Sequence, residues 1–320
     1  MQHEALDLLR TRCELRILNG YPHEDALAGA CHDAEAILAR LGVVTARVME
    51  AAPRLRIIAR HGAGSDGVDL PAATARGIVV TTTGSANAGA VAEYTFALLL
   101  GLLRKIPSAD RGMRAGGWNR VPLVGSGLHG RTFGIVGLGH VGNHVARIAE
   151  GFGMQVLAAQ SHRGGSTSTS VPRLPLIELL SRADVVSVHL RLGPQTAGLI
   201  DASAIAAMRQ GTVLVNTARG ELVNEAALIA ALREGHLAGA ALDTYAVEPL
   251  PDDSPLRGMP NVLLSPHVAG QTQEAVRRVG LTAAQCILDE LDGRRPDFVV
   301  NPEAYARRAK SVDGAEPVIR

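Results

Sequence analysis

One stretch, residues 131–160, constrains the fold of this chain more than any other, and it reads RTFGIVGLGHVGNHVARIAEGFGMQVLAAQ. It opens with a short β-branched run, Phe133–Val136, that ends in glycines spaced as G-x-G-x-x-G. Apolar residues then recur at helical spacing up to Phe152, and a second apolar run, Met154–Ala159, follows. The stretch therefore predicts a strand, a glycine turn, a helix and a second strand.

The three glycines of this motif indicate a dinucleotide-binding turn. The first, Gly137, allows a tight bend, the second, Gly139, lets a pyrophosphate approach the backbone, and the third, Gly142, lets the helix pack closely on the strand. The amides at the helix N-terminus then face the phosphates. Glycine-rich turns are common, but here the flanking strand and helix lie where the mechanism requires them.

The end of the second strand departs from the usual pattern for NAD. Where an NAD-specific site offers Asp or Glu to the adenine ribose, this chain has Gln160, followed by Ser161 and, two residues on, Arg163. A carboxylate would repel a 2′-phosphate, whereas these side chains could accept one. The sequence therefore predicts a nicotinamide cofactor, NAD(P)H, with a weak preference for NADP(H). The alternative interpretation is that Arg163 belongs to a solvated loop that contacts nothing.

Length, charge and cysteine content exclude several other classes. A length of 320 residues is enough for two domains, and a net charge of +1 gives no electrostatic reason to expect nucleic acid or an anionic membrane as partner. The N-terminus lacks the apolar core of a signal peptide, and the most apolar stretch, Val91–Leu103, is too short to span a bilayer. Cys13, Cys31 and Cys286 are widely spaced, which indicates neither a disulfide framework nor a metal site. We expect a soluble, cytoplasmic protein without a metal.

The first hundred residues alternate apolar runs with helical stretches, which is typical of a parallel α/β sheet. The expected strands are Leu15–Leu18, Ala34–Ala39, Arg54–Ala59 and Ile78–Thr81. A glycine-rich loop, RHGAGSDGVDL at 60–70, follows the third strand. Its amides at Gly62 and Gly64 could face a small anion at the carboxyl end of that strand, and the alternative is a turn without a ligand. A long apolar helix over Ser85–Ile106 is expected to cross between domains.

A second domain is expected from about Gly130 onward. Besides the two strands of the glycine motif, the sequence predicts strands at Asp184–Leu190, Thr212–Asn216, Gly239–Leu242 and Asn261–Leu264. Six strands with intervening helices match a doubly wound dinucleotide fold. A last helix is expected from about Cys286, and Asp297–Asn301 resembles a strand that could rejoin the first sheet. The charged tail after Pro302 is expected to be loosely held.

Three polar residues come just after strands of the second domain. Arg219 follows the strand Thr212–Asn216, Glu248 follows the next strand, and His267 follows the last one. Reduction of a 2-keto acid needs a cation to bind the carboxylate and an acid to protonate the new alkoxide, which Arg and His supply. A neighbouring Glu would favour the imidazolium form and orient the ring. Each residue taken singly also fits a surface ion pair, a turn or a loop histidine, but together they indicate catalysis.

These segments resemble the D-isomer-specific 2-hydroxyacid dehydrogenases, a family that includes phosphoglycerate dehydrogenase and hydroxypyruvate/glyoxylate reductases. The similarity extends from about Leu15 to Asn301 and rests on the glycine motif, NTARG at 216–220, Glu248-Pro249, SPHVAG at 265–270, RHGAGSDGVDL at 60–70 and VAEYT at 91–95. The resemblance implies an α/β fold of two doubly wound parallel-sheet domains. A Rossmann cofactor domain, residues 102–286, would be inserted into a flavodoxin-like substrate domain, residues 1–101 and 287–320.

The resemblance also implies roles for single residues. Arg219 would bind the substrate, Glu248 would tune the histidine and His267 would act as acid and base. The backbone amides of Ala63 and Gly64 would hold the substrate carboxylate. Further cofactor contacts are implied at His140, Val141, Thr217, Ala218, Asp243 and Gly270. The family implies a homodimer formed largely by the cofactor domains.

Three functions stay open at this point. The first is hydride transfer between a nicotinamide cofactor and C2 of a small D-2-hydroxy acid or 2-keto acid, as in a glyoxylate or hydroxypyruvate reductase. The second is phosphoglycerate dehydrogenase activity without a regulatory domain, because the chain ends about twenty residues past Asn301. The third is a corepressor-like protein that senses dinucleotide and binds partners. Glu248 argues against formate dehydrogenase, which has Gln at the corresponding position.

Overall fold

The glycine motif lies between a strand and a helix, as its spacing predicts. In the computed structural model, which describes residues 3–20, 22–160 and 170–313, β4 (Thr132–Val136) is followed by α7 (His140–Gly151) and β5 (Gln155–Ala159). Gly137 has a φ of +110°, and a Cβ built on Gly142 would lie 2.3 Å from the Gly137 carbonyl oxygen. Both positions therefore require glycine, one for its backbone angle and one for close packing of the helix on the turn.

Seven parallel strands form the sheet around this motif, in the order β10-β9-β8-β7-β4-β5-β6. The strands not yet located are β6 (Arg173–Leu174), β7 (Val185–Val188), β8 (Thr212–Asn216), β9 (Leu237–Leu242) and β10 (Val262–Leu264). The order reverses beside β4, which is the doubly wound arrangement that places a dinucleotide outside the carboxyl ends of the strands. All six predicted strands are present, and the two-residue β6 is the one that the sequence did not predict.

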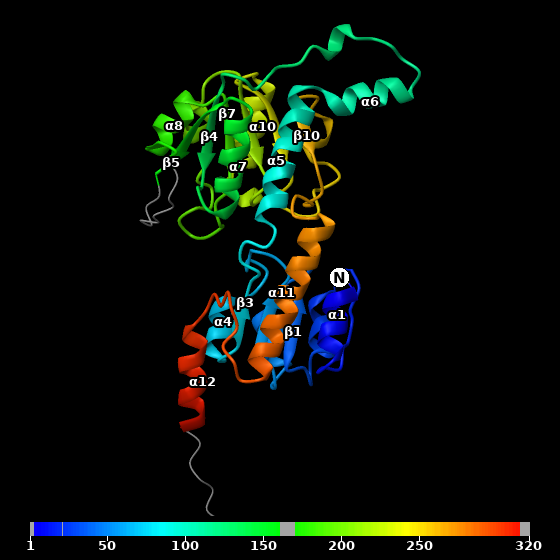
Figure 1. Cartoon of the computed structure of the whole chain (residues 1–320), viewed down its shortest axis with the longest axis vertical. Helices are drawn as coiled ribbons and strands as arrows, with labels where there is room; N and C mark the ends of the chain where they lie inside the picture. Colours follow the sequence, from blue (N-terminus) through cyan, green and yellow to red (C-terminus); the bar gives the residue numbers. More distant parts are fainter. Residues whose placement is uncertain (1–2, 21, 161–169, 314–320) are drawn as a thin grey trace, which may run out of the picture. The chain divides into compact units, whose positions relative to one another are not determined.

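Helices cover both faces of this sheet (Figure 1). One face packs against α8 (Leu176–Arg182), α9 (Ala202–Ala207) and α10 (Glu225–Arg233). The other packs against α5 (Ala88–Leu103) and α7. On that second face the Phe96 ring stacks on Phe133 and on Phe152, with centroids 5.5 and 5.4 Å away. No helix in the described ranges is both long and apolar enough to cross a membrane.

The chain divides into two units, each with its own core. Unit 1 comprises residues 1–87 and 271–320, and unit 2 comprises residues 88–270. Both boundaries fall earlier than the 101/102 and 286/287 positions predicted from the sequence. The first boundary falls earlier because α5 packs along α7 and against one face of the sheet at β8, β9 and β10. The whole helix therefore belongs to unit 2 and does not bridge two domains.

An extended arm follows α5 in unit 2. It contains α6 (Ile106–Arg114) and a 3-10 turn at Val121–Leu123, and it returns where the Ser126 N–H donates to the Leu103 carbonyl at 3.0 Å. Figure 1 shows the arm extending away from the unit 2 sheet. The arm and the amino-terminal ends of β8 and β9 line a groove of about 1010 Å³.

Unit 1 contains a smaller parallel sheet with the order β1-β2-β3, formed by Ala36–Ala39, Ile57–Arg60 and Val79–Thr81. One face packs against α1 (His3–Arg10) and α11 (Gln273–Leu291). The other face packs against α2 (Glu24–Ala30), α3 (Ala46–Glu50) and α4 (Leu70–Ala75).

The predicted first strand, Leu15–Leu18, is wrong, because this segment pairs with no strand in the described part of the chain. Its residues Ile17 and Leu18 are 53% and 41% exposed. Without that strand, the described strands of unit 1 lie in the order β1-β2-β3. The α/β class with helices on both faces of a parallel sheet is confirmed.

The C-terminal part differs most from the sequence prediction. Helix α11 begins at Gln273, well before Cys286, and the Thr272 side chain caps it by accepting the Ala275 N–H at 3.1 Å. The expected strand at Asp297–Asn301 is a single antiparallel bridge between Val299 and Thr81. It rejoins the unit 1 sheet at β3, but as a bridge instead of a full strand.

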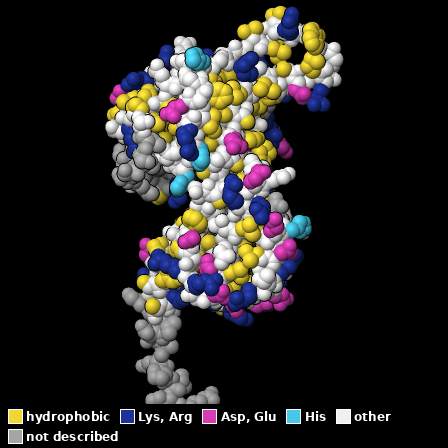
Figure 2. Space-filling view, in the orientation of Figure 1, with side chains coloured by type: hydrophobic (Ala, Val, Ile, Leu, Met, Phe, Trp, Pro, Cys, Tyr) yellow, Lys and Arg dark blue, Asp and Glu magenta, His cyan; other side chains and the backbone are white. Residues whose placement is uncertain are grey.

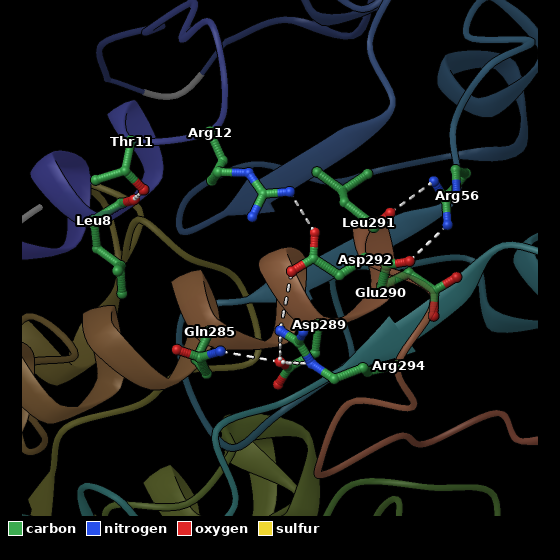
Figure 3. A network of polar contacts seen from close by, with 10 residues as sticks. All are labelled: Leu8, Thr11, Arg12, Arg56, Gln285, Asp289, Glu290, Leu291, Asp292 and Arg294. Atoms are coloured by element: carbon green, nitrogen blue, oxygen red, sulfur yellow. Dashed lines mark hydrogen bonds and ion pairs between the residues drawn. The ribbon is translucent and has the colours of Figure 1, made fainter.

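A polar network ties the end of α11 to the rest of unit 1 (Figure 3). Arg56 donates to the carbonyl of Glu290 at 2.6 Å, and Arg12 pairs with Asp292 at 2.7 Å. The Glu290 side chain accepts from Tyr305 and pairs with Arg308, both on α12 (Glu303–Asp313). The prediction of a loosely held tail after Pro302 is therefore wrong for the first eleven residues beyond it, which form a helix.

Candidate active site

Three polar side chains lie beyond the carboxyl ends of three adjacent strands in unit 2. Arg219 follows β8, Glu248 follows β9 and His267 follows β10. Because the strands are parallel neighbours, the turns that carry these residues leave the sheet at the same edge.

Glu248 and His267 form a hydrogen-bonded pair. The Nδ1 of His267 lies 2.7 Å from Oε2 of Glu248, and the backbone N–H of Tyr245 donates to Oε1 at 3.0 Å. Burial is the largest single influence on the pKa of Glu248 and acts to raise it. The hydrogen bond and charge of His267, the Tyr245 N–H and the charge of Arg219 together outweigh burial and lower that pKa. The carboxylate therefore stays ionised beside the imidazole ring, and Nε2 is left for proton exchange with a substrate.

The turn that carries Arg219 packs closely against the turn that carries Glu248. A Cβ built on Gly220 would lie 1.9 Å from the carbonyl carbon of Tyr245, so only glycine permits this approach. The side-chain amide of Asn216 donates to the Arg219 carbonyl at 2.7 Å and holds the turn. The guanidinium therefore comes from a turn that is locked beside the Glu248–His267 pair.

The glycine turn fits a pyrophosphate. Gly139 caps α7, and a Cβ built on it would meet no atom within 4 Å, so the backbone there is open to close approach. His140 and Val141 are the first two residues of the helix, where free N–H groups favour an anion. These residues would hold the diphosphate of a dinucleotide cofactor.

The other residues expected to contact the cofactor lie on the turns after β8 and β9 and beyond β10. Thr217 is 7% exposed, and its hydroxyl lies 3.0 Å from that of Thr95 on α5; Ala218 follows it. The Asp243 carboxylate is buried and accepts hydrogen bonds from the turn that carries His267, and Gly270 ends that turn. Their contacts with a cofactor stay a prediction.

Gln160 lies at the carboxyl end of β5, where its side chain is exposed and its N–H donates to the Leu174 carbonyl at 2.8 Å. Ser161 and Arg163 lie outside the described residues, so their contact with a 2′-phosphate stays a prediction. The preference between NAD and NADP stays a prediction.

Ala63 and Gly64 lie in unit 1, in the loop between β2 and α4. Arg60 Nε donates to the Gly64 carbonyl at 3.4 Å, and burial lowers the pKa of His61 to about 4. The loop therefore presents a neutral imidazole beside its predicted carboxylate site. In the described ranges no three His, Cys, Asp or Glu side chains are grouped so as to hold a metal ion.

Comparisons with known proteins show which family this chain is similar to. The profile described as "D-isomer specific 2-hydroxyacid dehydrogenase, NAD binding domain" matches residues 96–269. The chain is 37% identical over 315 residues to a glyoxylate reductase of Thermofilum pendens, covering 95% of this chain and 93% of that one. The chain belongs to the D-isomer specific 2-hydroxyacid dehydrogenase family.

Other members of the family are similar in sequence or structure. A D-3-phosphoglycerate dehydrogenase of Mycobacterium tuberculosis is 41% identical over 296 residues, which cover 92% of this chain and 56% of that enzyme. The chain thus spans little more than half the length of this relative. A crystal structure of a Thermus thermophilus protein superposes with a TM-score of 0.86 at 38% identity, covering 93% of this chain and 96% of that one.

Four residues near the candidate active site of this chain were not predicted from the sequence to have a role. Tyr245 bridges the turns after β9 and β10, and Thr95 contacts Thr217 from α5. Ser187 and His189 pair at 2.8 Å at the end of β7, and burial lowers the pKa of His189 to about 3, so that its ring is neutral. The VAEYT segment signalled Thr95, but nothing in the local sequence assigns a function to the other three.

Proposed function

We propose that this chain transfers a hydride between a nicotinamide dinucleotide and C2 of a small D-2-hydroxy acid or 2-keto acid, as glyoxylate and hydroxypyruvate reductases do. The observation that carries the proposal is the Glu248–His267 pair, at 2.7 Å, on the same sheet edge as a glycine turn that is open at Gly139. A proton donor and a dinucleotide site on one sheet edge are what a carbonyl reduction requires.

Each residue of the site has a defined task in this reaction. Arg219 would bind the substrate carboxylate and polarise the C2 carbonyl with its planar, permanently charged guanidinium. His267 would donate a proton from Nε2 to the oxygen at C2, while Glu248 holds Nδ1 and stabilises the charged ring. A bound nicotinamide dinucleotide supplies the hydride. The Ala63–Gly64 amides would contribute a carboxylate contact.

The first test compares keto acids and a histidine variant. Purified protein is assayed for oxidation of NADPH and NADH with glyoxylate, hydroxypyruvate, pyruvate, phosphohydroxypyruvate and a bulky aromatic 2-keto acid. We expect turnover with the small keto acids and, for His267→Ala, a loss of about 10²- to 10⁴-fold in kcat with cofactor still bound. Near-normal turnover of His267→Ala would remove the role assigned to this residue.

The same assay separates the other functions. Preference for phosphohydroxypyruvate would favour a phosphoglycerate dehydrogenase, a candidate supported by the identity with that enzyme over most of this chain. Absence of turnover with every keto acid, combined with NAD(H)-dependent capture of a protein partner, would favour the corepressor-like function.

We infer a preference for NADP(H) from the exposed amide of Gln160 at the end of β5, where an acidic side chain would repel a 2′-phosphate. Gln160→Asp is expected to raise the KM for NADPH by at least about fivefold and to affect NADH less, since one repulsive charge contact is worth on the order of 1 kcal/mol or more. Equal changes for both cofactors would contradict the preference.

We also propose that the protein acts in the cytoplasm.

We further propose that the arm of unit 2 forms a homodimer interface. The arm carries large apolar side chains that are 54–83% exposed: Ile106, Met113, Trp118, Val121 and Val124. Figure 2 shows hydrophobic side chains gathered on this arm, the kind of surface that marks a protein contact. Val121→Asp with Val124→Asp should convert a dimer to a monomer in light scattering, and a wild-type monomer would refute the interface.

A further inference from the structure

We propose that Asp243 is a positioning residue, which holds in place the turn that carries His267, in addition to the cofactor contact that the family resemblance implies. The inference rests on the proposed reductase function. Its side chain is 0% exposed. One carboxylate oxygen accepts the Ser265 hydroxyl and the Val268 N–H at 2.9 Å, and the other accepts the Ala269 N–H at 2.8 Å. Both oxygens are therefore engaged by residues that flank His267.

The turn needs such an anchor because His267 has an unfavourable backbone conformation. Its φ is +54°, in the left-handed region, which is unfavourable for a non-glycine residue because Cβ comes close to the following carbonyl oxygen. The His267 N–H donates to the Asp243 carbonyl at 2.9 Å, so main chain and side chain of Asp243 hold the same turn. The conformation is kept because the surrounding hydrogen bonds overdetermine it.

Tyr245 provides a second anchor to the same turn. Its hydroxyl lies 2.9 Å from the Ser265 carbonyl and 3.1 Å from the Ser265 N–H, and burial raises the pKa of Tyr245 to about 12, which keeps the hydroxyl protonated. The Tyr245 backbone N–H also holds Glu248. Both partners of the Glu248–His267 pair are thus positioned from one segment, residues 243–245.

Only a carboxylate satisfies these contacts. Three donors converge on Asp243, and an ionised carboxylate offers acceptors alone. Asparagine, which has the same shape, would have to present its NH₂ group to at least one of the donors. A buried donor facing another donor is costly, so Asp243→Asn is expected to displace the His267 turn while leaving the glycine turn unchanged.

The experiment measures turnover and cofactor binding separately in Asp243→Asn. We expect kcat to fall by about 10²-fold, because a displacement of about 1 Å at a catalytic group costs that much, while the Kd for NADPH changes less than about threefold. A Kd raised tenfold or more with kcat unchanged at saturating NADPH would overturn the proposal and assign Asp243 to cofactor binding alone.

A second measurement is independent of activity. In proton NMR, the Nδ1–H of His267 held by Glu248 should give a downfield signal that is absent from His267→Ala. We expect Asp243→Asn to lose or shift this signal, and an unchanged signal would overturn the positioning role. If the wild type turns over no keto acid, the proposed function fails, while the NMR comparison still decides the role of Asp243.

Asp184→Asn is the matched control. Asp184 also accepts a backbone N–H, from Thr132 at 2.9 Å, and pairs with Arg209 at 2.8 Å, but it precedes β7 at the opposite edge of the sheet. The Asp184→Asn protein should be less stable than the wild type, yet keep the wild-type kcat and NMR signal.

If Asp243→Asn does not fold, two other variants test the proposal. Ser265→Ala and Tyr245→Phe remove one anchor each, and each should lower kcat and shift the NMR signal. Wild-type values in both variants would overturn the proposal.

Discussion

At the residue scale, the hydrogen bonds determine which of the two hydroxyls, Thr95 or Thr217, donates its proton to the other. Thr95 donates its hydroxyl proton to the Val91 carbonyl at 2.8 Å, so in its contact with Thr217 at 3.0 Å it can only accept. Thr217 therefore donates to Thr95 and has acceptor capacity left for a ligand. Thr95→Val should free the Thr217 proton and raise the Kd for NADPH by about five- to tenfold, the value of one hydrogen bond.

The control for this prediction is Thr95→Ser, which keeps the hydroxyl and should restore the wild-type Kd. Titration of NADPH fluorescence measures both variants. An identical Kd for Thr95→Val and the wild type would show that Thr217 does not accept a bond from the cofactor.

The Glu248 carboxylate predicts a pH dependence of stability at the same scale. Its pKa is lowered in the folded protein, so its contribution is present above the ordinary glutamate pKa of about 4.3 and is lost as the pH falls through the lowered value. Urea unfolding midpoints of the wild type and Glu248→Gln should differ by a constant amount above about pH 5 and converge below it. A difference that grows as the pH falls below about 5 would indicate a raised pKa and would contradict the assigned direction.

The sequence predicts some residues of the site better than others. The glycines of the motif and the residues Arg219, Glu248 and His267 could be proposed from the sequence because spacing and strand ends are local properties, and the structure has the three residues after three adjacent strands. The anchoring of the histidine turn by Asp243 was not, because its donors lie more than twenty residues away across β9 and β10. Such contacts depend on which strands are neighbours, and local patterns do not contain that information.

At the element scale, α12 is held through one buried charge. Glu290 on α11 has a side chain that is 3% exposed, and it pairs with Arg308, which also donates to the Gly77 carbonyl at 2.8 Å. Arg308→Ala leaves this carboxylate buried and should destabilise unit 1 by about 2–3 kcal/mol in urea unfolding. Its neighbour Arg307 is exposed, so Arg307→Ala should change stability by less than about 0.5 kcal/mol. Equal effects would exclude a specific role for the ion pair.

The elements also show where periodicity fails. Apolar runs predicted the strands of unit 2 well, because parallel strands buried on both faces are continuously apolar. The run at Leu15–Leu18 is also mostly apolar, although Arg16 interrupts it, but a strand needs a ladder partner, and none pairs with it in the described chain. The start of α11 at Gln273 was missed, although Thr272 is a favoured N-cap residue and Glu274 is an acidic residue in the first turn.

At the scale of the whole molecule, each unit has its own core and its own sheet, so unfolding should occur in two steps. The predicted cofactor contacts from Gly137 to Gly270 all lie in unit 2. Binding at a hundredfold excess over Kd stabilises the bound unit by about 2.7 kcal/mol, which for a unit of this size raises Tm by about 5–10 °C. Calorimetry with NADPH should therefore move one transition and leave the other in place. Arg308→Ala identifies the second transition as unit 1, because it should lower that one alone. A single transition that responds to both changes would mean that the two units unfold together.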